Sequence, residues 1–208
     1  MPTSPTNLRP ASPLFALAEK GSMAGELLDV YLHLDALEDI FDVVNPRERH
    51  EAGGLLAGEA GQDDTGAFLL VRRALPALRA RGERVSLTFG PEAWEELWAA
   101  HERECPELAV VGWYHTHPGL GVFLSEPDQF IHRHFFTAGH QIALVYDPDE
   151  FRWGVFYWDG EGLRAARGLY LYSEAADFGR RLGSLRYPAL ERALREVAPE
   201  WIILHEAD

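Results

Sequence analysis

The sequence predicts an α/β protein of the α+β kind, in which a mixed sheet is flanked by helices. Its 208 residues suit one domain. The content of 47% hydrophobic and 25% charged residues is close to the average of globular proteins, so a packed core is expected. Segments with strand and helix patterns follow one another without regular alternation, which argues against a doubly wound fold.

The chain is expected to divide into three parts. Residues 1–26 are rich in proline and serine and lack a basic end followed by an apolar core, which predicts a flexible tail and not a secretory signal. The ordered domain is placed at residues 27–172, and a helix with an edge strand forms an extension at residues 173–208. The one cysteine, Cys105, excludes an internal disulfide, which fits a cytoplasmic location. No apolar run approaches the roughly 20 residues that a membrane-spanning helix needs.

In the first half of the chain, apolar patterns predict strands and an acidic pair predicts a helix start. Asp35 followed by Glu38 is a capping-box pattern, so a helix is expected from Asp35 to about Arg49. A turn-rich connection is expected at residues 59–66. The strands are expected at "LLDVYLHL" (27–34), "GGLLAG" (53–58), "AFLLVRRAL" (67–75) and "RVSLTF" (84–89).

The second half adds three helices and more strands. Pro91 marks a first helical turn, and Trp94, Leu97 and Trp98 follow at helical spacing, so a helix is expected at residues 91–104. The other helices are expected at about residues 126–137 and 174–197. The strands are expected at "ELAVVGWYH" (107–115), "QIALVYDP" (141–148), "FRWGVFYW" (151–158), "LRAARGLYLY" (163–172) and, as an edge, "EWIILH" (200–205).

Two histidines close the strand that ends in "GWYHTHP". Residues two apart in an extended segment point to the same face, so His115 and His117 can both reach one ion. Zinc accepts imidazole nitrogen and in catalytic sites usually has three protein ligands and a water. Asp128 is the best candidate for the third ligand, because the glycine-rich loop at residues 119–124 can fold it back.

A second pair, His132 and His134, is the internal comparison. It lies on a predicted helix, where residues two apart point roughly 200° away from each other. These two side chains are therefore expected to be helix residues, on the surface or partly buried, that do not share an ion.

Ser125 and Asp128 also have a purely structural interpretation. "SEPD" is a strong helix start, with serine at the N-cap, proline in the first turn and an acid three residues later. Taken alone, such a pair is more often a cap than a catalytic pair. The two interpretations are compatible, because a capped helix start is a rigid place from which to present Asp128 to a metal.

Metal-assisted hydrolysis needs a base and a group that stabilises the oxyanion. Ser125 is a candidate hydrogen-bond donor to a developing oxyanion. Among the upstream carboxylates Glu51 stands out, because it directly precedes "AGGLLAG", whose small residues allow close approach to a neighbouring strand. The alternative is that Glu51 is an ordinary solvated glutamate.

These residues together resemble a known family, the JAMM/MPN+ metallopeptidases of the Mov34/PAD-1 type. The pattern consists of a glutamate, His-x-His-Pro, seven further residues and Ser-x-x-Asp, and "EAGGLLAG" resembles the segment that carries the family's glutamate. The resemblance implies an MPN/JAMM fold with a cytidine-deaminase-like core. It also implies that His115, His117 and Asp128 bind one Zn²⁺, that Glu51 is the general base and acid, and that Ser125 stabilises the oxyanion.

The resemblance covers roughly residues 27–160 and implies cleavage of isopeptide or peptide bonds after the C-terminal glycine of ubiquitin or ubiquitin-like proteins. The chain is most similar to stand-alone prokaryotic members, whose substrates are ubiquitin-like or sulfur-carrier β-grasp proteins with a Gly-Gly tail. It departs from some deubiquitinating members in one respect, because no second, structural zinc site can be assigned to His132, His134 and His140.

The formal net charge of −14 disfavours binding to nucleic acid or to anionic membranes and suits a basic partner. Two alternatives to the peptidase remain at this stage: a non-catalytic MPN-type interaction scaffold, and a metallohydrolase with a non-protein substrate such as a nucleotide. The sequence leaves open whether the protein is a monomer or a homodimer.

Overall fold

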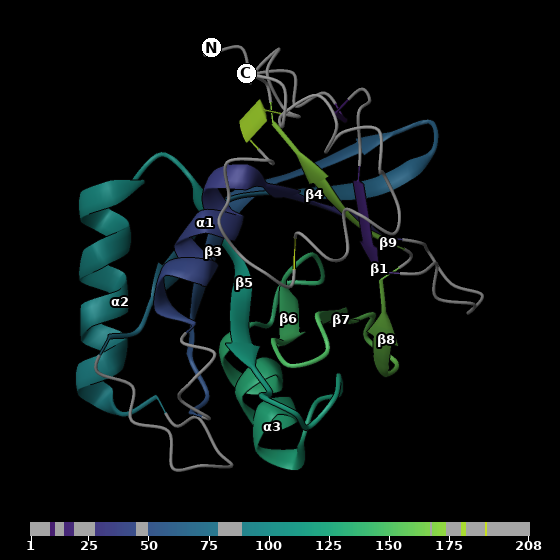
Figure 1. Cartoon of the computed structure of the whole chain (residues 1–208). Coiled ribbons are helices and arrows are strands. Elements are labelled where there is room, and N and C mark those ends of the chain that lie inside the picture. Colours follow the sequence, from purple (N-terminus) through teal and green to yellow (C-terminus); the bar gives the residue numbers. More distant parts are fainter. Residues whose placement is uncertain are drawn as a thin grey trace.

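The computed structural model describes residues 9–10, 15–18, 28–44, 50–78, 89–166, 168–173, 180–181 and 190. Nine strands of these ranges form one mixed sheet in the order β1-β9-β2-β4-β3-β5-β6-β7-β8, accompanied by three helices of eight residues or more, so the predicted fold class is confirmed (Figure 1). The elements are β1 (Phe15–Ala18), β2 (Asp29–His33), α1 (Leu34–Val43), β3 (Gly53–Asp63), β4 (Gly66–Pro76), α2 (Pro91–Glu104), β5 (Ala109–Thr116), α3 (Glu126–Phe135), β6 (Ile142–Asp147), β7 (Arg152–Trp158), β8 (Leu163–Ala165) and β9 (Gly168–Tyr172).

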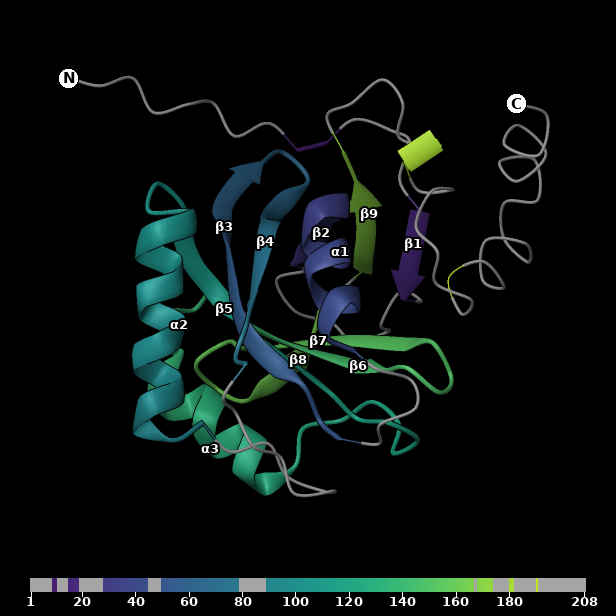
Figure 2. The ribbon, with the colours of Figure 1, turned by 60° about the vertical axis from the view of Figure 1, so that its left-hand side comes forward.

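Helices α1 and α2 lie on opposite faces of the sheet. Figure 2 shows β3, β4 and β5 passing between α1 and α2, and the core divides in the same way. Leu56 and Tyr114 pack with the apolar face of α1, whereas their neighbours Leu55 and Trp113 pack with α2. Successive residues of a strand point to opposite faces, so a continuous apolar run is needed to fill both cores.

The N-cap of the first helix lies two residues earlier than predicted. Its N-cap is His33, whose Nδ1 accepts a hydrogen bond from the Asp35 backbone N–H at 3.1 Å, so the prediction that Asp35 is the cap was wrong. Asp35 instead lies in the first turn, where a negative charge is favourable. The helix also ends at Val43, followed by an extended Val44, and is therefore shorter than predicted.

The third and fourth strands form a longer hairpin than predicted. The segment at residues 59–66 was predicted as a connection, but β3 pairs with β4 as far as Asp63 opposite Gly66. Asp63 explains the tight turn, because its Oδ1 accepts hydrogen bonds from both the N–H (2.9 Å) and the hydroxyl (2.6 Å) of Thr65.

The segment predicted as one strand at residues 163–172 is two strands. β8 pairs with β7 at one end of the sheet order, whereas β9 lies between β1 and β2 near the other end. Ala166 still follows the β7–β8 register, because its N–H donates to the Val155 carbonyl at 2.9 Å, and β9 then begins at Gly168 beside β1 and β2. The predictions for α2, α3 and β5 to β7 match the structure to within two residues.

Several predicted elements lie largely outside the described residues: the strand at 84–89, the helix at 174–197 and the strand at 200–205. Arg180, Arg181 and Leu190 are helical, and Leu190 is buried against the α1 face of the core. Within the range expected to be a tail, β1 pairs with β9, and Arg9 forms ion pairs with Asp29 and Asp63. No helix within the described ranges is long and apolar enough to cross a membrane.

Candidate metal centre

The candidate site lies where the carboxyl end of β5 meets the start of α3 (Figure 1). His115 Nε2 and His117 Nε2 are 3.0 Å apart, and Asp128 Oδ2 lies 3.4 Å from the first and 3.7 Å from the second. All three side chains are buried. The structure therefore brings together the three residues that the sequence nominated as metal ligands.

The donor set of this cluster fits a zinc ion. Its ligand atoms all lie within 4.8 Å of one another, and no other such group of three is found in the part of the chain that the structure describes. Two imidazole nitrogens and one carboxylate oxygen match the three protein ligands of catalytic zinc sites. The tautomer of His117 also fits: its Nδ1 faces the Gly121 carbonyl at 3.2 Å, and a carbonyl only accepts, so in the neutral ring Nδ1 carries the proton and Nε2 keeps its lone pair.

Burial and charge act differently on the two histidines. Burial lowers the pKa of His115, which keeps its imidazole neutral as a metal ligand requires. Burial also disfavours the charged form of His117, but the Asp128 carboxylate and, more weakly, Glu51 outweigh it and raise the pKa of this imidazole. For Asp128, burial raises the pKa of the carboxyl, but the neighbouring imidazoles and the hydrogen bond from Ser125 outweigh it and hold that pKa far below its usual value. The carboxylate is therefore ionised at neutral pH.

Ser125 and Asp128 form the capping box of α3. Ser125 Oγ accepts from the Asp128 N–H at 3.3 Å, and Asp128 Oδ2 accepts from the Ser125 N–H at 2.8 Å. The predicted helix start is therefore confirmed. Asp128 Oδ2 is also the oxygen that faces the two histidines, and it accepts the Ser125 hydroxyl at 2.5 Å. The cap fixes the carboxylate before any ion binds.

Glu51 reaches the site through strand pairing. Gly53 pairs with His115, and the ladder continues through two hydrogen bonds between Ala52 and Thr116: the Thr116 N–H donates to the Ala52 carbonyl at 2.8 Å, and the Ala52 N–H donates to Thr116 Oγ1 at 2.9 Å. Extending the register by one residue on each strand would bring Glu51 opposite His117, and the Glu51 charge does act on that ring, because it contributes to raising the pKa of His117. Glu51 is buried, with 6% of its surface exposed, so the interpretation as an ordinary solvated glutamate was wrong.

Stacking of the Trp113 ring on the His115 ring supports His115 and was not predicted from the sequence. The His115 ring lies parallel to the Trp113 ring, with centroids 4.6 Å apart and planes at 12°. Trp113 Nε1 donates in turn to His132 Nδ1 at 3.3 Å. Among the described residues His115 Nδ1 has no hydrogen-bond partner, so stacking is what orients this ring. Trp113 stands two residues before His115 on a strand, and this same-face spacing was the signal that could have identified it.

His132 and His134 point away from each other on α3, as the helix geometry predicts. His134 is exposed and its Nδ1 bonds to the Phe130 carbonyl at 2.8 Å, whereas His132 points into the core with 1% of its surface exposed. His132 is thus more buried than expected. Its Nε2 has no hydrogen-bond partner within the described ranges, and burial lowers the pKa of the imidazole to about 4.

His132 should make the stability of the fold depend on pH. Between pH 6.5 and about 4 the unfolded chain binds a proton at this imidazole and the folded chain does not, so stability falls as pH falls. The full loss for such a shift is up to about 3 kcal/mol. Chemical denaturation of the metal-free protein from pH 7 to pH 4 should show this loss in wild type and its absence in His132→Asn, which keeps an acceptor for Trp113. His134→Asn should behave like wild type; equal pH slopes in all three proteins would contradict the prediction.

Comparison with known proteins finds a family whose model matches the part of the chain that contains this site. Residues 26–139 match the family model described as JAB1/Mov34/MPN/PAD-1 ubiquitin protease. This range begins just before β2, ends after α3 and contains all five residues nominated from the sequence.

Individual relatives are more distant. The chain is 31% identical over 121 residues to the NAD(+) hydrolase TcpA of a Theionarchaea archaeon, covering 58% of this chain and 34% of the relative. It is 28% identical over 142 residues to the AMSH-like protease sst2 of Schizosaccharomyces pombe, covering 66% and 31%. A solution structure of a protein from Desulfitobacterium hafniense shares the fold, with a TM-score of 0.53 and 18% identity over 72% of this chain and 97% of that one. The chain thus spans about a third of the length of these curated relatives.

Proposed function

The chain belongs to the JAB1/Mov34/MPN/PAD-1 family, and we propose that it is a zinc-dependent isopeptidase or peptidase. Its substrate in this proposal is a ubiquitin-like or sulfur-carrier protein, cleaved behind the C-terminal glycine. One observation carries the proposal: two histidines and an aspartate converge in the matched domain, beside a buried glutamate whose charge acts on His117.

In this proposal His115, His117 and Asp128 hold one zinc ion. The chemistry that zinc supplies when bound is Lewis acidity, which lowers the pKa of a water ligand to about 7 and polarises a carbonyl. The protein prepares the site by burying all three side chains, by the Nδ1–H tautomer of His117 and by the capping hydrogen bonds on Asp128. These contacts are local and do not depend on the substrate.

Glu51 is assigned the proton transfers. Its carboxylate accepts a proton from the attacking water as the oxygen bonds to the scissile carbonyl carbon. It then donates this proton to the leaving nitrogen as the carbon–nitrogen bond breaks, which gives a glycine carboxylic acid and a free amine, and the acid loses its proton to solvent. The burial of Glu51 and the action of its charge on His117 support this role.

Ser125 is assigned the stabilisation of the oxyanion. Its hydroxyl donates to Asp128 Oδ2 in the structure and would have to turn toward the substrate oxygen. This rotation is feasible because the Ser125 backbone N–H also donates to Asp128 Oδ2, so the carboxylate stays fixed when the hydroxyl leaves.

The substrate class is tested by two reactions on one preparation. We expect about one zinc per chain by elemental analysis and metal-dependent cleavage of a ubiquitin-like domain joined through Gly-Gly to a reporter, in linear and isopeptide forms. Hydrolysis of NAD⁺ is the comparison reaction, because one relative is named for it. A protein that binds no zinc, or that hydrolyses NAD⁺ and neither Gly-Gly substrate, would refute the proposal.

A further inference from the structure

A buried carboxylate that the proposed chemistry does not use lies at the end of β6. Asp147 is completely buried. Its Oδ1 accepts the N–H groups of Gly119 and Asp149, each at 3.0 Å, and its Oδ2 accepts the N–H of Gly121 at 2.8 Å. Within the described ranges Asp147 forms no ion pair, so three backbone donors alone compensate its charge. A buried carboxylate is costly unless its hydrogen bonds are satisfied, so its presence here requires an explanation.

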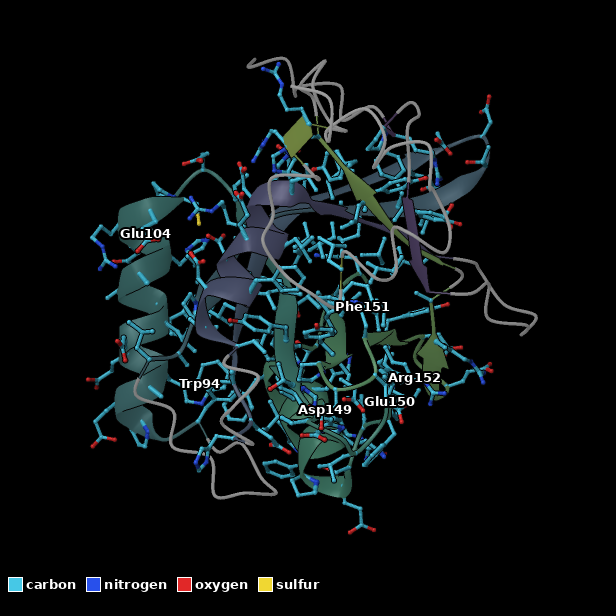
Figure 3. All side chains as sticks on the ribbon, viewed as in Figure 1. Trp94, Glu104, Asp149, Glu150, Phe151 and Arg152 are labelled. Carbon is cyan, nitrogen blue, oxygen red and sulfur yellow. The ribbon has the colours of Figure 1, made fainter. Side chains whose placement is uncertain are left out.

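The two glycine donors belong to the loop that follows the second histidine. Gly119 and Gly121 have φ values of +71° and +84°, in the left-handed region that favours glycine. This conformation turns both of their N–H groups toward one carboxylate. Asp149 also lies against the loop, because a Cβ added at Gly119 would be 2.9 Å from its Oδ2. Figure 3 labels Asp149 and Glu150, which lie in the turn between β6 and β7.

The same peptide segment connects Asp147 to a candidate metal ligand. Gly121 donates its N–H to Asp147 and offers its carbonyl oxygen to His117 Nδ1 at 3.2 Å. The backbone of His117 is held to β6, the strand that ends at Asp147, because its N–H donates to the Tyr146 carbonyl at 2.8 Å. Metal-binding histidines commonly donate their second N–H to a carbonyl or carboxylate that fixes ring and tautomer. In this protein the Gly121 carbonyl accepts the hydrogen bond from His117 Nδ1, and the buried Asp147 carboxylate holds the loop that carries this carbonyl.

We propose that Asp147 is a positioning residue of the metal centre, which acts through the Gly119–Gly121 loop to hold the His117 ring in its metal-binding tautomer. The inference rests on the metal site of the proposed function. It assigns no catalytic contact to Asp147, and it predicts that removing its charge weakens metal binding even though none of its atoms touches a proposed ligand.

Asp147→Asn tests the inference with little change in shape. Asparagine keeps one accepting oxygen but presents an NH₂ group where the carboxylate accepts a loop N–H, so at least one glycine loses its partner. We expect the Kd for Zn²⁺, measured by competition with a chelator, to rise about 10- to 100-fold. A second readout needs no metal: nitrogen chemical shifts of the His117 imidazole should change from a dominant Nδ1–H form to a mixture of tautomers.

Glu150→Gln is the matched control, because it removes the same charge from the same turn. Glu150 is exposed and pairs with Arg152 at 3.1 Å, and both residues are labelled in Figure 3. The Zn²⁺ affinity and the His117 tautomer of this variant should therefore stay as in wild type. If Asp147→Asn does not fold, Gly121→Ala replaces it: no atom lies within 4 Å of the added Cβ, so this variant strains only the loop backbone and should also weaken Zn²⁺ binding.

The outcomes separate the inference from the proposed function. If Zn²⁺ binds wild type and the Asp147→Asn variant equally well and the tautomer is unchanged, the inference is refuted while the zinc site stands. A lower melting temperature with unchanged Zn²⁺ affinity would refute it as well, because it would show a purely structural role. If wild type itself binds no Zn²⁺, the proposed function and the inference fail together.

Discussion

Glu51→Gln is expected to slow cleavage of a Gly-Gly-linked substrate by a factor of about 10²–10⁴ while leaving zinc bound. Glutamine has nearly the same shape as glutamate but cannot accept the proton of the attacking water. Glu51 is not one of the three clustered ligands, so the metal content should not change. Single-turnover cleavage assays and zinc analysis on the same samples measure the two quantities together.

Glu126→Gln is the control for this substitution. Glu126 is an exposed carboxylate in the first turn of α3, next to the capping serine, and its loss should leave the cleavage rate within about twofold of wild type. Full activity of Glu51→Gln would exclude Glu51 as the base. Loss of zinc from that variant would instead make Glu51 a fourth ligand, and partner binding without zinc or activity would favour the scaffold alternative.

The parts of the site that depend on local pattern were predictable from the sequence. The same-face placement of His115 and His117 follows from the two-residue period of a strand, and the helix start at Ser125 follows from its capping residues. Both contacts involve residues close in the sequence. The structure places Asp128 with the histidines because the cap of α3 orients its carboxylate.

Two other features of the site, the contacts of Asp147 and the position of Glu51, depend on partners far along the chain and do not follow from local pattern. Asp147 meets Gly119 and Gly121 from 28 and 26 residues away, and the position of Glu51 depends on the pairing of Gly53 with His115. β5 and β6 are parallel neighbours, so their carboxyl ends lie side by side. That arrangement explains why an aspartate ending β6 meets the loop that follows β5, and it becomes visible only once the strand order is known.

The corrected elements have different causes. His33 displaced Asp35 as the cap of α1, because the fold places its ring nitrogen within reach of the Asp35 N–H, and local propensity does not encode that contact. Residues 163–172 read as one apolar strand, but the sheet requires one part beside β7 and the other beside β2. In the second case strand pairing outweighs local propensity, whereas the cap at His33 is a contact between residues two apart in the sequence.

Asp128→Ala is expected to remove zinc binding and to weaken the start of α3 at once. Even outer partners of metal ligands contribute 10- to 100-fold in affinity, so losing one of three ligands should raise the Kd for Zn²⁺ by more than about 100-fold. The lost capping-box hydrogen bond should also destabilise the metal-free protein, on the order of 1 kcal/mol.

Ser125→Ala separates these two effects. It removes the side chain that caps the Asp128 N–H but keeps the carboxylate, so the metal-free protein should lose about 0.5–2 kcal/mol. Because the Ser125 hydroxyl also donates to Asp128 Oδ2, the Kd for Zn²⁺ should rise by about 10- to 100-fold, which is less than in Asp128→Ala. A ligand that binds only the folded state raises its melting temperature. Thermal unfolding with and without Zn²⁺ should therefore show the rise in wild type and Ser125→Ala but not in Asp128→Ala. A Zn²⁺-induced rise that persists in Asp128→Ala would mean that the ion is held without this carboxylate, and the helix start would then be only a cap.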